Sequence, residues 1–231
     1  MALTHYFTNK LINYQSENSP AFKLRRKRAE RIKTIIEECY NKYSEVNIID
    51  IGGTKIYWNI IPTEFLIENK VHISVVNLPS DNPLPKNDSI FSFYEGDGCN
   101  LEEFPDNSFH IAHSNSVIEH VGNNANRERF AHEIKRVAKI YYLQTPNYRF
   151  PIEPHFVTPF FHWFPRKIRI KLVCYFDLGW FRKAKTREEA EGYVDSCRLL
   201  TKKELKALFP EATVFKERVL FFIKSFILIK K

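Results

Sequence analysis

The sequence has no apolar run of the roughly 20 residues that a membrane-spanning helix needs. Its first residues, Met1 to His5, lack the charged and apolar regions of a secretory signal peptide. Its four cysteines lie far apart and form no C-x-x-C pair: Cys39, Cys99, Cys174 and Cys197. This usage favours reduced thiols over a disulfide framework or a zinc site. We therefore expect a cytoplasmic protein.

Several binding motifs are also missing. The sequence contains neither a P-loop, G-x-x-x-x-G-K-[ST], nor a complete G-x-G-x-x-G fingerprint. A nucleoside ligand without a phosphate chain therefore fits better than a dinucleotide. No RNA-binding signature accompanies the net charge of +8, which argues against a nucleic-acid partner. No compact group of His, Asp and Glu has metal-ligand spacing, so we expect no metal.

The most informative stretch is residues 46–53, Val-Asn-Ile-Ile-Asp-Ile-Gly-Gly. Apolar residues surround one acid, Asp50, and two glycines, Gly52 and Gly53, end the run. This pattern predicts a buried parallel strand that stops in a tight turn. Open α/β sheets bind ligands at the carboxyl ends of such strands, where glycine lets the backbone approach a ligand closely. An acid at this position can accept hydrogen bonds from a ligand.

Three further apolar-rich segments, residues 71–77, 90–95 and 108–113, follow at the spacing of βα units. Each ends in a polar turn, and the carboxyl ends of parallel strands meet at one edge of a sheet. The polar residues that we expect along this edge are Asp50, Asn77, Asp97 and Asn115. Single strands commonly end in polar turns, but four in succession favour a binding site.

These segments resemble class I S-adenosylmethionine-dependent methyltransferases of the methyltransferase domain 11 type. The matching phrases are residues 50–53, 95–98, 104–110, 114–121 and 133–137. Residues 144–156, Gln-Thr-Pro-Asn-Tyr-Arg-Phe-Pro-Ile-Glu-Pro-His-Phe, look like a bacterial subgroup associated with surface-glycan genes. The resemblance extends from about Glu45 to the last residue.

The resemblance implies a doubly wound α/β fold with a seven-stranded, mostly parallel, Rossmann-like sheet. It also implies S-adenosylmethionine as cofactor and S-adenosylhomocysteine as product. The residues expected to bind the cofactor are Asp50, Ile51, Gly52, Gly53, Asn77, Leu78, Asp97, Gly98, Asn115 and Ser116. Two departures from the family pattern bear on cofactor affinity: the turn after Asp50 lacks a third glycine, and Asn77 replaces the usual acid.

We expect an N-terminal helical segment over residues 1–44 and the methyltransferase domain over residues 45–231. Residues 146–196 are rich in proline and aromatic residues and do not fit a βα unit, so they are expected to form an inserted substrate cap. Thr201 and Glu204 then form a capping box that opens the last helix. The last two strands are expected at residues 213–218 and 225–230, with residues 221–223 between them in the core.

Basic residues gather at residues 23–28 and 166–171. We interpret the first group as the solvated face of a helix. The second lies within the aromatic cap, where three interpretations stay open: packing of the cap's own core, a substrate wall, or peripheral contact with the inner membrane surface.

Methyl transfer from a sulfonium is an in-line displacement, for which the protein supplies alignment and desolvation. An alcohol acceptor must also lose its proton to a histidine or carboxylate. The candidates are His155, Glu153, Glu119 and His120, with His113 a further one. His155 is the first choice because it lies inside the cap, just after the fifth strand that we expect at residues 140–144. His110, within a strand, is expected to be structural.

The resemblance implies O-methylation of a hydroxyl on a sugar or glycolipid intermediate. Two alternatives remain: a small-molecule or RNA methyltransferase, and a catalytically silent protein that binds the cofactor or a glycan without turnover. An assay of S-adenosylhomocysteine release separates the silent protein from the enzymes.

Overall fold

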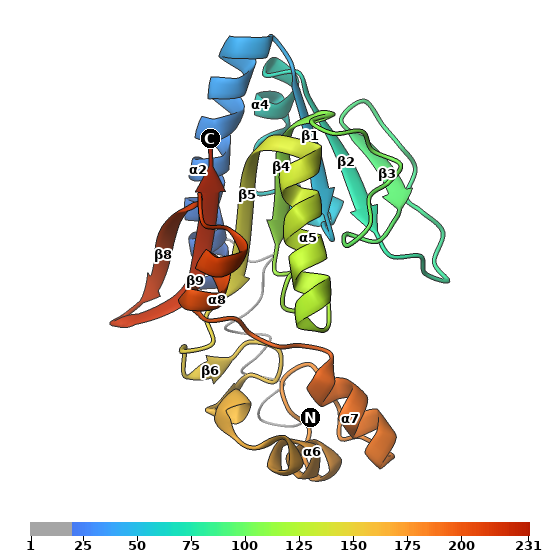
Figure 1. Ribbon diagram of the computed structural model, residues 1–231, viewed down its shortest axis with the longest axis vertical. Helices are drawn as coiled ribbons and strands as arrows, with labels where there is room; N and C mark the ends of the chain where they lie inside the picture. Colours follow the sequence, from blue (N-terminus) through green and yellow to red (C-terminus); the bar gives the residue numbers. More distant parts are fainter. Residues whose placement is uncertain (1–19) are drawn as a thin grey trace.

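The computed structural model describes the backbone of residues 20–231 and the side chains from residue 25 onward. Its centre is one sheet in the strand order β3-β2-β1-β4-β5-β9-β8 (Figure 1). The strands are β1 (Val46–Ile51), β2 (Val71–Asn77), β3 (Phe91–Glu95), β4 (Phe109–Asn115), β5 (Ala138–Pro146), β8 (Thr213–Val219) and β9 (Phe222–Lys230). Strands β1 to β5 are parallel, and β9 runs antiparallel to both β5 and β8. The predicted seven-stranded, doubly wound, Rossmann-like sheet is therefore confirmed.

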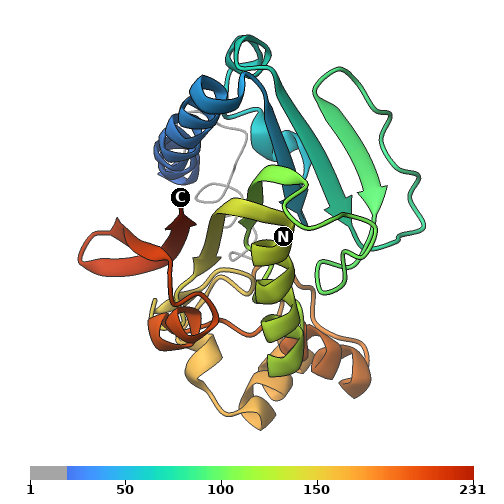
Figure 2. The same ribbon diagram turned by 45° about the horizontal axis from the view of Figure 1, so that its top comes forward.

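Helices cover both faces of the sheet. One face carries α2 (Pro20–Tyr43), α3 (Lys55–Trp58) and α4 (Thr63–Glu68), and the other carries α5 (Asn124–Val137) and α8 (Lys202–Leu208). Figure 2 shows α2 and α5 on opposite sides of the strands. The predicted N-terminal segment appears as α2, and residues 1–19 lie outside the described part of the chain. No helix among the described residues is long and apolar enough to span a bilayer.

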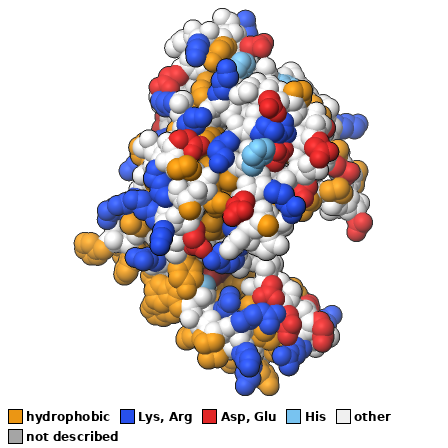
Figure 3. Space-filling view, viewed as in Figure 1, with side chains coloured by type: hydrophobic (Ala, Val, Ile, Leu, Met, Phe, Trp, Pro, Cys, Tyr) orange, Lys and Arg blue, Asp and Glu red, His pale blue; other side chains and the backbone are white. Residues whose placement is uncertain are grey.

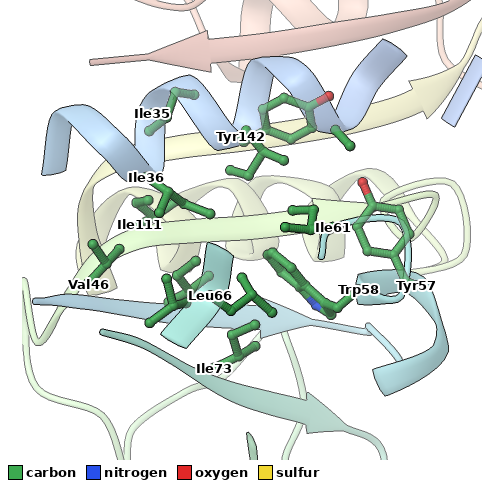
Figure 4. Packing of buried hydrophobic residues seen from close by; sticks show 14 of the residues in the cluster. Ile35, Ile36, Val46, Tyr57, Trp58, Ile61, Leu66, Ile73, Ile111 and Tyr142 are labelled. Carbon is green, nitrogen blue, oxygen red and sulfur yellow. The ribbon is translucent and has the colours of Figure 1, made fainter. Parts of the chain in front are cut away.

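Alternation along β1 divides its side chains between two hydrophobic clusters. Val46 and Ile48 pack with α2 in one cluster (Figure 4), whereas Ile49 and Ile51 pack with α5 in the other. Successive residues of a strand point to opposite faces. Asp50 therefore lies on the α2 face, a placement that decides its role below.

The cap, residues 146–196, is a small packed unit. It contains β6 (Ile152–Glu153), β7 (Thr158–Pro159), the 3-10 helix η1 (Phe161–Trp163), α6 (Arg166–Tyr175) and α7 (Arg187–Asp195). Its own hydrophobic cluster consists of Phe156, Phe161, Ile170, Val173, Leu178, Ala184, Ala190 and Val194. The parallel strands point toward it, so the cap faces their carboxyl ends (Figure 1).

The cap's aromatic residues serve more than one purpose. Phe156 and Phe161 stack with ring centroids 4.2 Å apart inside the cap cluster. Phe160, Trp163 and Phe164 are exposed. Some of the cap's aromatic residues therefore pack its core, and others face outward.

The prediction that residues 221–223 lie in the core is wrong for the two phenylalanines. Phe221 is 91% exposed and Phe222 is 52% exposed. Strand β5 pairs with β9 only from Ser225 onward, whereas β8 and β9 continue pairing to Val219 and Phe222. The tip of the β8–β9 hairpin thus extends beyond the pairing with β5, which leaves Phe221 almost fully exposed and Phe222 half exposed.

Candidate active site

A cavity of about 450 Å³ lies at the carboxyl ends of the central strands, and we call it the cofactor cavity. Strands β1 and β4 are neighbours here, which is the topological switch point where open α/β sheets bind ligands. The volume lies within the range of small-molecule sites. Six residues predicted to bind the cofactor line it: Ile51, Gly52, Asn77, Leu78, Asp97 and Gly98.

The turn after β1 depends on both of its glycines. Gly52 has a φ of +71°, and a Cβ there would lie 2.5 Å from Cγ2 of Val117. A Cβ at Gly53 would lie 1.8 Å from a carboxylate oxygen of Asp50. The turn therefore closes tightly over Val117 and Asp50 without a third glycine.

Polar groups on two neighbouring turns shape the rim of the cofactor cavity. The side-chain amide of Asn77 donates a hydrogen bond of 2.9 Å to the carbonyl oxygen of Gly53, bracing the glycine turn. Oδ1 of Asp97 accepts from the backbone N–H of Cys99 at 2.9 Å, and Asp97 is exposed at its turn. The Asp97 carboxylate thus faces the cavity as a hydrogen-bond acceptor, which matches its expected position.

Asp50 has a different role from the predicted one. Its carboxylate is fully buried and accepts hydrogen bonds from Nε1 of Trp58 at 2.8 Å and from Nδ1 of His113 at 2.6 Å. It does not line the cofactor cavity, which opens on the α5 side of β1. Asp50 therefore acts as the buried hydrogen-bond acceptor that ties α3 to β4. His113, considered as a base, is held in the same network.

Asn115 and Ser116 also lie outside the cofactor cavity lining. Oδ1 of Asn115 accepts a hydrogen bond of 2.9 Å from Arg28 of α2. The hydroxyl of Ser116 donates to Oε1 of Gln144 at 3.0 Å. Asn115 lies two residues after His113 on β4 and so shares its face, the one that α2 covers.

The structure brings the predicted catalytic residues into one cluster between the sheet and the cap. Nδ1 of His155 donates to Oε1 of Glu153 at 2.7 Å. The other oxygen of Glu153 accepts from the backbone N–H groups of His155 and Phe156. Burial opposes a charge on His155, but the hydrogen bond and the negative charge of Glu153 raise its pKa overall. Glu153 therefore fixes both the tautomer and the orientation of His155.

His120 stands between His155 and the cofactor cavity. It lines the cavity, its Nδ1 donates to the carbonyl oxygen of Ser196 at 2.9 Å, and its Nε2 lies 3.1 Å from Nε2 of His155. Burial lowers the pKa of His120. His120 is therefore the imidazole that borders the cofactor cavity, and His155 lies on the side of His120 away from that cavity.

Glu119 is a second buried carboxyl group near this cluster. Its Oε2 accepts from the hydroxyl of Thr145 at 2.9 Å, and burial raises its pKa to about 7. The charge of Glu119 also acts on the pKa of His155. Glu119, His120, Glu153 and His155 thus form one interacting group, although they come from separate segments of the chain.

A second cavity of about 730 Å³, the cap cavity, lies between the cap and the segments of residues 122–123 and 197–204. Glu153 and Cys197 contribute to its wall, and Gly122 lines both cavities. Aromatic and charged groups share the lining: Tyr148, Phe156, Arg169 and Arg198. Sequence reasoning missed Cys197, since a cysteine far from any other carries no motif. His120 was predicted as a candidate proton acceptor, whereas Gly122 lies just beyond the family phrase of residues 114–121 and was not predicted.

We expect Asp97→Ala to weaken binding of S-adenosylhomocysteine. Loss of a charged hydrogen-bond acceptor costs on the order of 1–3 kcal/mol, or about 5- to 150-fold in affinity. Calorimetry measures the effect. Asp81→Ala, an exposed residue of the β2–β3 loop outside the cavity lining, is the control. Unchanged affinity in a folded Asp97→Ala protein would remove Asp97 from the site.

Residues 69–140 match a family model described as a methyltransferase domain. Similar solved structures include a SAM-dependent methyltransferase from Methanosarcina mazei, at 18% identity and a TM-score of 0.47, covering 80% of this chain and 91% of that one. A protein from Pyrococcus horikoshii OT3 follows at 15% identity and a TM-score of 0.49, covering 97% of this chain and 96% of that one. No curated protein matches the chain. The match covers less than half of the chain and supports a methyltransferase domain.

Proposed function

We propose that this S-adenosylmethionine-dependent methyltransferase, as the domain match of residues 69–140 supports, O-methylates a sugar or glycolipid intermediate. One observation carries the proposal. The cofactor cavity and the cap cavity share Gly122, with His120 lining the first and Glu153 lining the second. His155 connects these two side chains, so groups that can take up a proton lie between cofactor and acceptor.

Bound S-adenosylmethionine would supply an electrophilic methyl group. The chain's own residues supply the other requirements of the reaction. The turn at Gly52 and the carboxylate of Asp97 bind and orient the cofactor. The paired imidazoles of His120 and His155 accept the proton of the acceptor hydroxyl, and the carboxylate of Glu153 stabilises the imidazolium that forms.

The lining of the cap cavity supports a carbohydrate acceptor. Tyr148 offers apolar ring surface, and Arg169, Arg198 and Asp195 offer groups that hydrogen-bond to hydroxyls. A wall with a few convergent polar groups among aromatic residues is typical of specific small-molecule sites. The cap therefore recognises the acceptor, and the sheet binds the cofactor.

Acceptor screening tests this proposal. The purified chain is incubated with S-adenosylmethionine and separate panels of sugars, glycolipids, other small molecules and RNA, and release of S-adenosylhomocysteine is measured. We expect release with a sugar or glycolipid. Release with RNA alone, or with another small molecule alone, would show that the acceptor is not a sugar or glycolipid. Cofactor binding without release in any panel would identify a silent binding protein.

We further propose that the chain contacts an anionic membrane surface through the β8–β9 hairpin. Its exposed tip consists of Leu220, Phe221 and Phe222. The adjoining groove combines these phenylalanines with basic side chains: Arg149, Lys202, Lys203, Lys206, Lys216 and Arg218. Figure 3 shows hydrophobic side chains gathered at this end of the molecule and on the adjoining cap. Apolar residues surrounded by positive charges fit a bilayer interface with anionic headgroups.

We expect Phe221→Ser to weaken binding to vesicles of phosphatidylcholine and phosphatidylglycerol. Removing a phenylalanine from the interface costs about 1.5–3 kcal/mol, or about ten- to a hundredfold in partitioning. Cosedimentation measures the effect, with Ile67→Ser, an exposed residue of α4, as control. Wild-type protein that stays in the supernatant with these vesicles would exclude the membrane contact.

A further inference from the structure

Three side chains with metal-binding atoms converge between the two cavities: His120, His155 and Cys197. One ring nitrogen of each histidine and the Sγ atom of the cysteine lie within 4.8 Å of one another. His120 follows β4, His155 lies at the start of the cap, and Cys197 follows α7. The two histidines are 35 residues apart in the sequence, and His155 and Cys197 are 42 residues apart. At these separations the three residues form no sequence motif. The expectation of no metal rested on sequence spacing and therefore does not apply to this folded cluster.

The hydrogen bonds of the two histidines leave both Nε2 atoms without protons. Nδ1 of His120 faces the carbonyl oxygen of Ser196, and Nδ1 of His155 faces the carboxylate of Glu153. Both partners are acceptors, so each Nδ1 carries the proton of its neutral ring. The two Nε2 lone pairs then face each other at 3.1 Å. This arrangement is unfavourable unless a cation lies between them.

The spacing of the two Nε2 atoms fits a tetrahedral zinc ion. Two imidazole nitrogens at the usual zinc–nitrogen distance are roughly 3.3 Å apart when they occupy tetrahedral positions. The observed separation of 3.1 Å is close to this value. Sγ of Cys197 lies 3.4 Å from the His155 ring at Nδ1, so the thiol borders the same space. Two imidazoles and a thiolate are ligand types that zinc prefers.

The surroundings resemble the outer shell of a metal site. Metal-binding histidines commonly donate their other N–H to a carboxylate or a backbone carbonyl, as His155 and His120 do here. The carboxyl groups of Glu153 and Glu119 add negative charge near Cys197, while Arg127 and Arg169 add positive charge. A proton shared by the two imidazoles would also relieve the lone pairs, and the zinc content of the protein distinguishes the two arrangements.

We propose that His120, His155 and Cys197 bind a zinc ion, with Nε2 of each histidine and Sγ of the cysteine as ligands. Three protein ligands leave a fourth position open, as in catalytic zinc sites. His120 lines the cofactor cavity and Cys197 lines the cap cavity, so the ion would lie between cofactor and acceptor. If the proposed function holds, the ion would lower the pKa of the acceptor hydroxyl directly, in place of the imidazole pair. The metal site itself does not depend on that function.

Metal analysis of the full chain tests the site. Protein stripped with a chelator is reloaded with Zn²⁺ and dialysed, and its zinc content is measured by mass spectrometry, without cofactor or acceptor. We expect about one zinc ion per wild-type chain, the stoichiometry of a mononuclear site. Cys197→Ser, His120→Ala and His155→Ala should each lose zinc. The controls Cys174→Ser and His132→Ala should retain it, because neither residue belongs to the cluster.

Cobalt substitution adds a test that depends on the thiolate. Wild-type protein loaded with Co²⁺ should show a sulfur-to-cobalt charge-transfer band, and Cys197→Ser should lose it while Cys174→Ser keeps it. Glu153→Gln should reduce zinc affinity by about ten- to a hundredfold, the usual effect of removing an outer-shell partner. Wild-type protein that retains no zinc, or retention by Cys197→Ser equal to that of Cys174→Ser, would overturn the proposal. Zinc binding without methyl transfer would overturn the proposed function alone.

Discussion

Replacing His155 with alanine should slow methyl transfer by about 10²–10⁴-fold, the usual contribution of a positioned proton acceptor. Affinity for S-adenosylhomocysteine should stay unchanged, because His155 does not line the cofactor cavity. Single-turnover rates with the acceptor from the screen measure the first effect, and calorimetry measures the second. His132→Ala, on the exposed surface of α5, is the control.

A wild-type rate in His155→Ala would make His155 structural, and His120 or Glu119 would then become the next candidate. The same rate loss is expected whether the imidazoles take the proton or hold zinc. Zinc content separates these two accounts, since only the second requires His155→Ala to lose metal. Rate and metal content should therefore be measured on the same preparations.

Replacing Gly52 with valine should abolish detectable binding of S-adenosylhomocysteine. The new Cβ would lie 2.5 Å from Val117, and the φ of +71° is one that a β-branched residue rarely adopts. The turn must shift, and the shift moves the wall of the cofactor cavity. Calorimetry measures the loss, and circular dichroism checks that the protein remains folded.

Gly192→Val is the matched control for this substitution. Gly192 lies in α7, where an added Cβ would meet no atom of the described residues within 4 Å beyond its neighbours and its own helix backbone, and its φ is not positive. The control should bind S-adenosylhomocysteine like the wild type. Wild-type affinity in a folded Gly52→Val protein would move the cofactor site away from the end of β1.

The sequence predicted the strands well because their signal is local. Buried parallel strands appear as short apolar runs bounded by turns, as at residues 46–51 and 71–77. The glycine turn at Gly52 was predicted for the same reason. Phe221 shows the limit of this reasoning, since hydrophobicity indicates burial only where another element covers the residue.

The face that a strand-end residue occupies follows from the alternation of side chains along the strand. Asp50 shares a face with Ile48, and both lie toward α2, whereas the cofactor cavity opens beside Ile51. Its carboxylate therefore meets Trp58 and His113 instead of a ligand. The same alternation places Asn115 against Arg28.

The convergence of His120, His155 and Cys197 could not be predicted from a single sequence. It depends on how the cap packs against the loop after β4, and that packing is long-range. The hydrogen bond from Nδ1 of His120 to the carbonyl oxygen of Ser196 is one contact that joins the two segments. Sequence reasoning selected both histidines for their chemistry, whereas only the folded chain shows that they face each other.

Calorimetric titration of the wild-type chain with S-adenosylhomocysteine, and in parallel with NADH, tests the central claim most directly. The cofactor cavity at Gly52, Asn77 and Asp97 should bind S-adenosylhomocysteine at one site per chain, and NADH should show no binding. Binding of NADH without binding of S-adenosylhomocysteine would contradict the methyltransferase account.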